Sequence, residues 1–139
     1  MFMFKLHPQL SLECITLCDL KLCRVLLAND RQYPWFILVP MQNGIKEIID
    51  LSEADQPLLW QESAKLSRVI QAIYGPDKLN VAALGNMVPQ LHVHHVARFI
   101  TDPAWPSPIW GKLPLVPYDE SQIEVIKHEL IATLTKPGF

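Results

Sequence analysis

The chain has 139 residues, and half of them are hydrophobic, which suits one ordinary domain with a sizeable core. Its formal net charge is −2. Without a basic surface to neutralise a phosphate backbone, we expect no nucleic-acid partner. No segment reaches the roughly 18 apolar residues of a membrane span, and residues 1–8 lack the pattern of a signal peptide. We therefore expect a single cytoplasmic domain over residues 1–139, with no membrane partner.

The first half of the chain carries three β-favouring segments. Residues 13–17 and 22–27 are short runs separated by a polar turn, which predicts a hairpin. After a polar loop, residues 35–39 form a continuous apolar run closed by Pro40. Such a run is typical of a central strand covered on both faces. The three cysteines, Cys14, Cys18 and Cys23, fit no zinc or CxxC spacing, so we expect reduced, buried thiols.

One long helix and further strands follow. Ser52 is the expected N-cap of the helix, because acidic residues occupy its first turn and an apolar stripe with 3–4 spacing runs to Gly75. Residues 79–84 and 91–99 predict two more strands. The proline-rich residues 102–117 predict an extended, irregular segment. Residues 120–134 resume a helical pattern as a C-terminal tail.

Polar residues alternate with apolar ones in Gln-Leu-His-Val-His-His-Val, residues 90–96. In a strand, residues two apart share one face, so Gln90, His92 and His94 are expected to point the same way. His95 would point to the other face, where we expect a partly buried ring bonded to a backbone carbonyl. Two imidazoles on one face indicate a functional site.

This stretch resembles the histidine triad signature His-φ-His-φ-His-φ-φ, in which φ is apolar, with Gln90 in place of the first His. The pair Asn29-Asp30 and the run Trp35–Pro40 resemble the acidic loop and the following strand of that family. Residues 85–88, Gly-Asn-Met-Val, resemble its phosphate-binding turn. The chain is thereby identified as a suspected member of the histidine triad (HIT) family, over roughly residues 13–105.

The resemblance implies an α+β fold, with an antiparallel sheet of about five strands, one long helix across it and a C-terminal helical tail. It also implies a homodimer that acts on nucleoside phosphoramidates or dinucleoside polyphosphates, as a hydrolase or nucleotidyl transferase, without cofactor or metal. By position His92 is the nucleophile that forms a nucleotidyl-histidine intermediate, with His94 and Gln90 beside it. The implied nucleotide-binding residues are Asn29, Asp30, Gly85, Asn86 and Val88.

The chemistry is reasonable from the residue types alone. A neutral imidazole is a competent nucleophile when a partner fixes one ring nitrogen as a donor. The second imidazole, His94, can donate to a phosphoryl oxygen, and backbone N–H groups of a glycine turn bind the developing anion. Asn29 or Asp30 is chemically suited to accept hydrogen bonds from ribose hydroxyls.

Two departures from the signature leave alternatives open. Gln90 cannot titrate, and Trp35 stands where many family members carry a further His. The chain could therefore be a nucleotide-binding module with weakened catalysis. A metal-binding protein is a second alternative, in which His92 and His94 would take a third ligand from His95, His128 or a carboxylate. Trp35 could equally be a core residue and Asn86 a simple turn residue.

Overall fold

A computed structural model describes residues 3–139; Met1 and Phe2, which belong to the apolar N-terminal stretch, lie outside the described residues. The elements follow in the order α1 (Pro8–Glu13), β1 (Cys14–Asp19), β2 (Cys23–Ala28), β3 (Trp35–Pro40), the short 3-10 helix η1 (Ile48–Asp50), α2 (Asp55–Tyr74), β4 (Lys78–Ala83), β5 (Val93–Arg98) and α3 (Glu120–Leu134).

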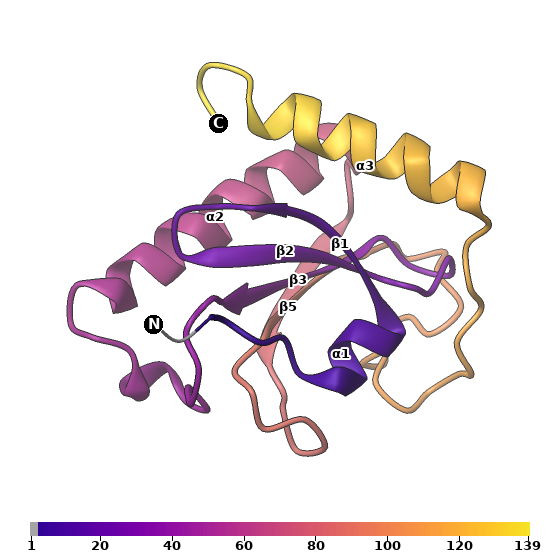
Figure 1. Cartoon of the computed structure of the whole chain (residues 1–139). Coiled ribbons are helices and arrows are strands. Elements are labelled where there is room, and N and C mark those ends of the chain that lie inside the picture. Colours follow the sequence, from indigo (N-terminus) through magenta and orange to yellow (C-terminus); the bar gives the residue numbers. More distant parts are fainter. Residues whose placement is uncertain (1–2) are drawn as a thin grey trace.

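The strands form one five-stranded sheet in the order β1-β2-β3-β5-β4, and every neighbouring pair is antiparallel. β3 lies at the centre, as its continuous apolar sequence predicts. The helices α2 and α3 pack against each other along one side of the sheet (Figure 1). The α+β prediction, with its long helix and its C-terminal helical tail, is confirmed.

Alternating side chains divide the sheet into two faces with different cores. Val25, Leu27, Phe36 and Leu38 belong to the larger cluster, which also contains Leu59, Leu66, Val69 and Ile70 of α2 and Leu130 and Leu134 of α3. Leu26, Ala28, Ile37 and Val39 belong instead to a cluster with Leu10 of α1 and Val88. The second face is therefore covered by the N-terminal segment and loops, which leaves room there for a cavity.

The helix boundaries differ from the prediction in two places. Ser52 does not occupy the N-cap position, because a turn over residues 52–55 precedes the helix; its hydroxyl accepts a hydrogen bond from the Asp55 amide at 3.1 Å, and α2 begins at Asp55. Gly75, with φ +57°, ends the helix in the left-handed conformation as predicted. The helix α1 was not predicted. It has only six residues, and His7 caps it by accepting a hydrogen bond from the Gln9 amide.

No helix within residues 3–139 combines the length and the hydropathy needed to cross a membrane.

Candidate active site

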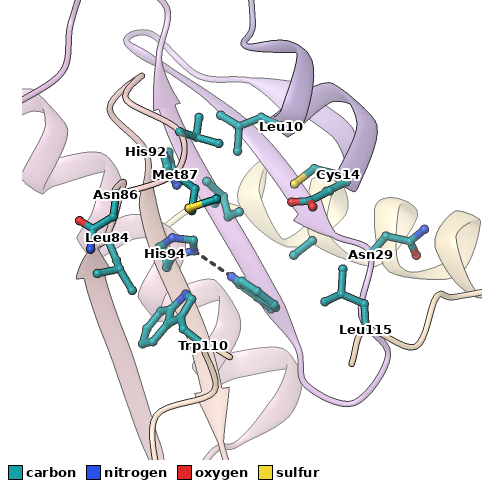
Figure 2. Close-up of a pocket in the computed structure, with 15 residues that line it drawn as sticks. Leu10, Cys14, Asn29, Leu84, Asn86, Met87, His92, His94, Trp110 and Leu115 are labelled. Carbon is teal, nitrogen blue, oxygen red and sulfur yellow. Dashed lines mark hydrogen bonds between the residues drawn. The ribbon is translucent and has the colours of Figure 1, made fainter. Parts of the chain in front are cut away.

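A cavity of about 330 Å³ opens on the sheet face opposite α2 and α3. Side chains from β3, β5, α1, the 84–88 turn and the proline-rich segment converge on it (Figure 2). Six residues that the sequence singled out line it, namely Asn29, Trp35, Asn86, Val88, His92 and His94. The period of two therefore does bring both imidazoles to one surface.

His92 lies at the entrance to β5 and is almost fully buried, with 5% of its surface exposed. Its Nδ1 lies 2.7 Å from the backbone carbonyl oxygen of Gln90. Because a carbonyl oxygen only accepts, Nδ1 must carry the proton, and in the neutral ring Nε2 then has a free lone pair. Burial lowers the pKa of His92 below its ordinary 6.5; the Gln90 carbonyl opposes the shift and His7 adds to it. The ring is therefore neutral at pH 7.

His94 has the opposite tautomer. The Trp35 indole N–H donates to His94 Nδ1 at 3.0 Å, the dashed line in Figure 2. Since an indole nitrogen can only donate, Nδ1 must accept and Nε2 must carry the proton. Nε2 is buried and has no hydrogen-bond partner among residues 3–139. Burial first, and the neighbouring His92 second, lower the pKa of His94 to about 4, although the Leu84 carbonyl acts against the shift.

The proline-rich segment closes one side of the cavity with Trp110. Its indole ring meets His94 edge-on, with 5.2 Å between ring centroids. Arg98 of β5 holds this segment in place. Its buried guanidinium forms an ion pair with Asp102 at 2.8 Å and donates a hydrogen bond to the Ser107 carbonyl at 2.9 Å. Trp105 stacks on that guanidinium and does not reach the cavity. Of the two tryptophans in the segment, Trp110 is the one that covers the site.

The Gly85–Pro89 turn borders the cavity on the side of His92. Asn86, Val88 and the fully exposed Met87 line it, whereas Gly85 lies behind them. A Cβ atom on Gly85 would lie 2.7 Å from the Val88 carbonyl oxygen and 3.4 Å from His92 Cε1. The absence of a side chain at Gly85 thus lets the turn pack directly against the nucleophile candidate.

Gln90 points its side chain away from the two imidazoles. Its Oε1 accepts from the His7 amide at 2.8 Å, and its Nε2 donates to the Lys5 carbonyl at 3.0 Å. β5 begins only at Val93, so the strand alternation that places His94 in the cavity does not extend back to Gln90. The side-chain amide of Gln90 therefore holds the N-terminal segment against the motif, and its backbone carbonyl is the group that hydrogen-bonds His92.

The structure separates the two residues of the 29–30 loop. Asn29 lines the cavity, and its Oδ1 accepts from the Tyr118 amide at 2.9 Å. Asp30 is buried outside the cavity, where its Oδ1 accepts from the amide and side chain of Gln32. Asn29 is thus the residue of this pair that a bound molecule in the cavity would meet.

The cavity also contains residues for which the sequence predicted no role in a site. Leu10 and Glu13 come from the unpredicted helix α1, and Cys14 follows them; Leu84 and Leu115 complete the apolar walls. Burial raises the pKa of the Cys14 thiol to about 12. None of these residues stands in a motif; a helical period over residues 8–13 could have indicated Leu10 and Glu13, and no local signal indicates the others.

The third ligand expected for a metal site is not brought to the imidazoles. His95 faces the helix layer, where Ser63 Oγ lies 2.7 Å from its Nε2, and its Nδ1 contacts the Val93 carbonyl at 3.1 Å, as predicted. His128 lies on α3. In the part of the chain that the structure describes, no three His, Cys, Asp or Glu side chains are grouped to hold a metal ion.

A family model for the HIT domain matches residues 10–101, which contain the strands, the long helix and both imidazoles. The chain belongs to the HIT domain family. HIT proteins bind nucleotides, and they are generally nucleotide hydrolases or transferases. The comparison with curated proteins finds no match.

Solved HIT structures resemble this chain over nearly its whole length. A histidine triad protein from Marinobacter aquaeolei VT8 has 50% identity and a TM-score of 0.93, and the match covers 96% of this chain and 97% of that one. One from Bradyrhizobium japonicum has 42% identity, a TM-score of 0.93 and coverage of 95% and 98%. One from Sinorhizobium meliloti 1021 has 38% identity, a TM-score of 0.91 and coverage of 94% and 96%.

Proposed function

We propose that this HIT protein is a nucleotide hydrolase or nucleotidyl transferase that works through a nucleotidyl-histidine intermediate on His92. One observation carries the proposal: the Gln90 carbonyl holds the Nδ1 proton of His92, which leaves the Nε2 lone pair free in a buried ring beside the cavity. Such an imidazole is neutral and correctly polarised for attack on phosphorus.

The reaction takes place in two displacements at the α-phosphorus. In the first, the Nε2 lone pair of His92 forms an N–P bond while the P–O or P–N bond to the leaving group breaks; the leaving group takes the electron pair, and an amine also takes up a proton from solvent. In the second, a water oxygen, which gives up its proton to solvent, or a phosphate oxygen attacks phosphorus, and the N–P bond breaks with its electrons returning to Nε2. His94 supports both steps by donating from Nε2 to a phosphoryl oxygen.

The rest of the cavity suits a nucleoside. Its lining is mostly apolar, with Leu10, Ala28, Ile37 and Leu115 available to contact a base. Figure 2 shows Asn29 and Cys14 across the cavity from the two imidazoles. We assign the ribose hydroxyls to Asn29, and the phosphate to the turn that contains Gly85, Asn86 and Val88.

Two further expectations stay predictions. We expect a homodimer, which light scattering on the purified protein measures directly, and a cytoplasmic location, which cell fractionation measures. The single domain over residues 1–139 is likewise a proposal, and one cooperative unfolding transition would support it.

The test of the function is release of adenylate from a fluorogenic adenosine phosphoramidate and from a dinucleoside polyphosphate, with and without a chelator. We expect release from at least one of these substrates that resists the chelator and disappears in His92→Ala. His128→Ala, which changes a histidine of α3, is the matched control and should retain release. Nucleotide binding without release would indicate the weakened binding module, and release that the chelator abolishes would indicate metal chemistry.

A further inference from the structure

The hydrogen bond from Trp35 to His94 decides what His94 can do with its proton. Trp35 Nε1–H occupies Nδ1 of His94 at 3.0 Å, so the one ring proton is on Nε2. If His94 gave that proton to a leaving group, the ring would be left as an imidazolate anion in a buried site. His94 can therefore donate a hydrogen bond, but it cannot act as a general acid in this state.

Neither His92 nor Gln90 supplies a proton at this end of the cavity. The Nδ1 proton of His92 is held by the Gln90 carbonyl at 2.7 Å. The Gln90 side chain does not titrate, and both its amide atoms are bonded to the backbone of residues 5 and 7. Cys14 lies on the opposite side of the cavity (Figure 2), and Glu13, which also lines the cavity, precedes it in the chain.

We propose, on the basis of the function proposed above, that Trp35 is a positioning residue that locks His94 as a hydrogen-bond donor and so restricts this enzyme to leaving groups that depart without a proton. Phosphoric anhydrides meet this condition, because the departing phosphate is a stable anion at neutral pH. Alkyl phosphoramidates do not, since their nitrogen must be protonated before the P–N bond breaks. The preferred substrates are thus nucleoside phosphoanhydrides, such as dinucleoside polyphosphates.

The surroundings of His94 keep it in this neutral state. His92 lies beside it in the cavity and His95 follows it on β5, and a positive charge on either would oppose protonation of the ring. β3 and the proline-rich segment present the uncharged rings of Trp35 and Trp110. The Leu84 carbonyl, directly after β4, favours the charged form of the ring, and the indole N–H on Nδ1 disfavours it. His94 should therefore stay neutral, with its proton on Nε2, throughout the neutral pH range.

The first arm of the test determines the tautomer of His94 and needs no turnover. Imidazole 15N chemical shifts at pH 7 should show His94 protonated at Nε2 and His92 protonated at Nδ1. Trp35→Phe removes the N–H but keeps a ring, so the titration midpoint of His94 should rise. Trp60→Phe makes the same change at an exposed position of α2 and should not move either histidine. An Nδ1-protonated His94 in the unaltered protein overturns the proposal.

The second arm compares leaving groups. Adenylate release is measured from adenylyl phenols of graded leaving-group pKa, from a dinucleoside polyphosphate and from an alkyl phosphoramidate. Because general-acid assistance contributes about 100-fold or more, kcat/KM for the phosphoramidate should be at least about 100-fold below that for the anhydride. Across the phenols, it should fall steeply with leaving-group pKa. Trp35→Phe should flatten this dependence at pH 6, and Trp60→Phe should not.

The outcomes are distinct. A flat dependence in the unaltered protein, or equal use of phosphoramidate and anhydride, overturns the preference while leaving the nucleotidyl-histidine mechanism in place. Absence of release from every substrate overturns the proposed function and the substrate preference with it, and the 15N shifts still decide whether Trp35 fixes the tautomer of His94.

Discussion

A side chain added at Gly85 would meet both the backbone of the turn and the proposed nucleophile, so Gly85→Ala is a sharp perturbation of the site. The added Cβ would lie 2.7 Å from the Val88 carbonyl oxygen, well inside the 3.4 Å at which ordinary contact begins. The obstacle is backbone, so the turn itself must move by several tenths of an ångström. Overpacking of this kind costs about 1–3 kcal/mol of unfolding free energy.

The same Cβ would also touch His92 Cε1 at 3.4 Å, so the displaced turn changes the position of the ring that attacks phosphorus. A misplacement near 1 Å reduces rates about 100-fold, so we expect kcat/KM for adenylate release to fall by about 10- to 100-fold. Urea unfolding and initial rates, measured on one preparation of each variant, give both quantities.

Gly75→Ala is the matched control. Gly75 has φ +57° at the end of α2, and no atom lies within 4 Å of an added Cβ. The substitution should cost about 1–2 kcal/mol through backbone strain and leave kcat/KM intact. If Gly85→Ala lost stability but kept the rate of the unaltered protein, the packing of the turn against His92 would have no role in catalysis.

Two further predictions concern groups near the site that do not themselves react. Gln90→Ala removes the hydrogen bonds to Lys5 and His7, so the unfolding free energy measured in urea should fall by about 1–3 kcal/mol. Adenylate release should be retained, because the backbone carbonyl that holds His92 stays. Complete loss of release in a folded variant would show that the side chain is catalytic. His95 is fully buried, and burial lowers its pKa to about 4. As the pH falls below about 6.5, His95 therefore binds a proton in the unfolded chain but not in the folded chain. The contribution of His95 to the unfolding free energy should therefore be fully present above pH 6.5 and fall by about 3 kcal/mol towards pH 4. In Ser63→Ala/His95→Leu, the unfolding free energy should lose this part of its pH dependence. An unchanged pH dependence in the double variant would contradict the assignment.

The strands, the long helix and the two imidazoles could be predicted because each depends on a local pattern. A period of two places His92 and His94 on one face and His95 on the other, and the structure confirms both placements. The left-handed Gly75 ends α2 where the sequence indicates. These features need no knowledge of distant contacts.

Contacts between distant segments could not be predicted. Gln90 points to residues 5 and 7, more than 80 positions away in the chain, because the N-terminal segment offers its amide a donor and an acceptor. Asp30 lies outside the cavity because it accepts hydrogen bonds from the half-buried backbone amides of Gln32 and Val116. The Trp35 bond to His94 depends on the pairing of β3 with β5, so a core role and a site role could not be separated beforehand.

The covalent intermediate on His92 is the most direct test of the account. The protein is mixed with a dinucleoside polyphosphate, quenched with acid-free denaturant within one turnover, and its intact mass and peptides are measured. We expect one adenylyl group bonded to His92, absent in His92→Ala. Adenylate release that continues in that variant, or turnover by the unaltered protein with no adduct on His92, would contradict it.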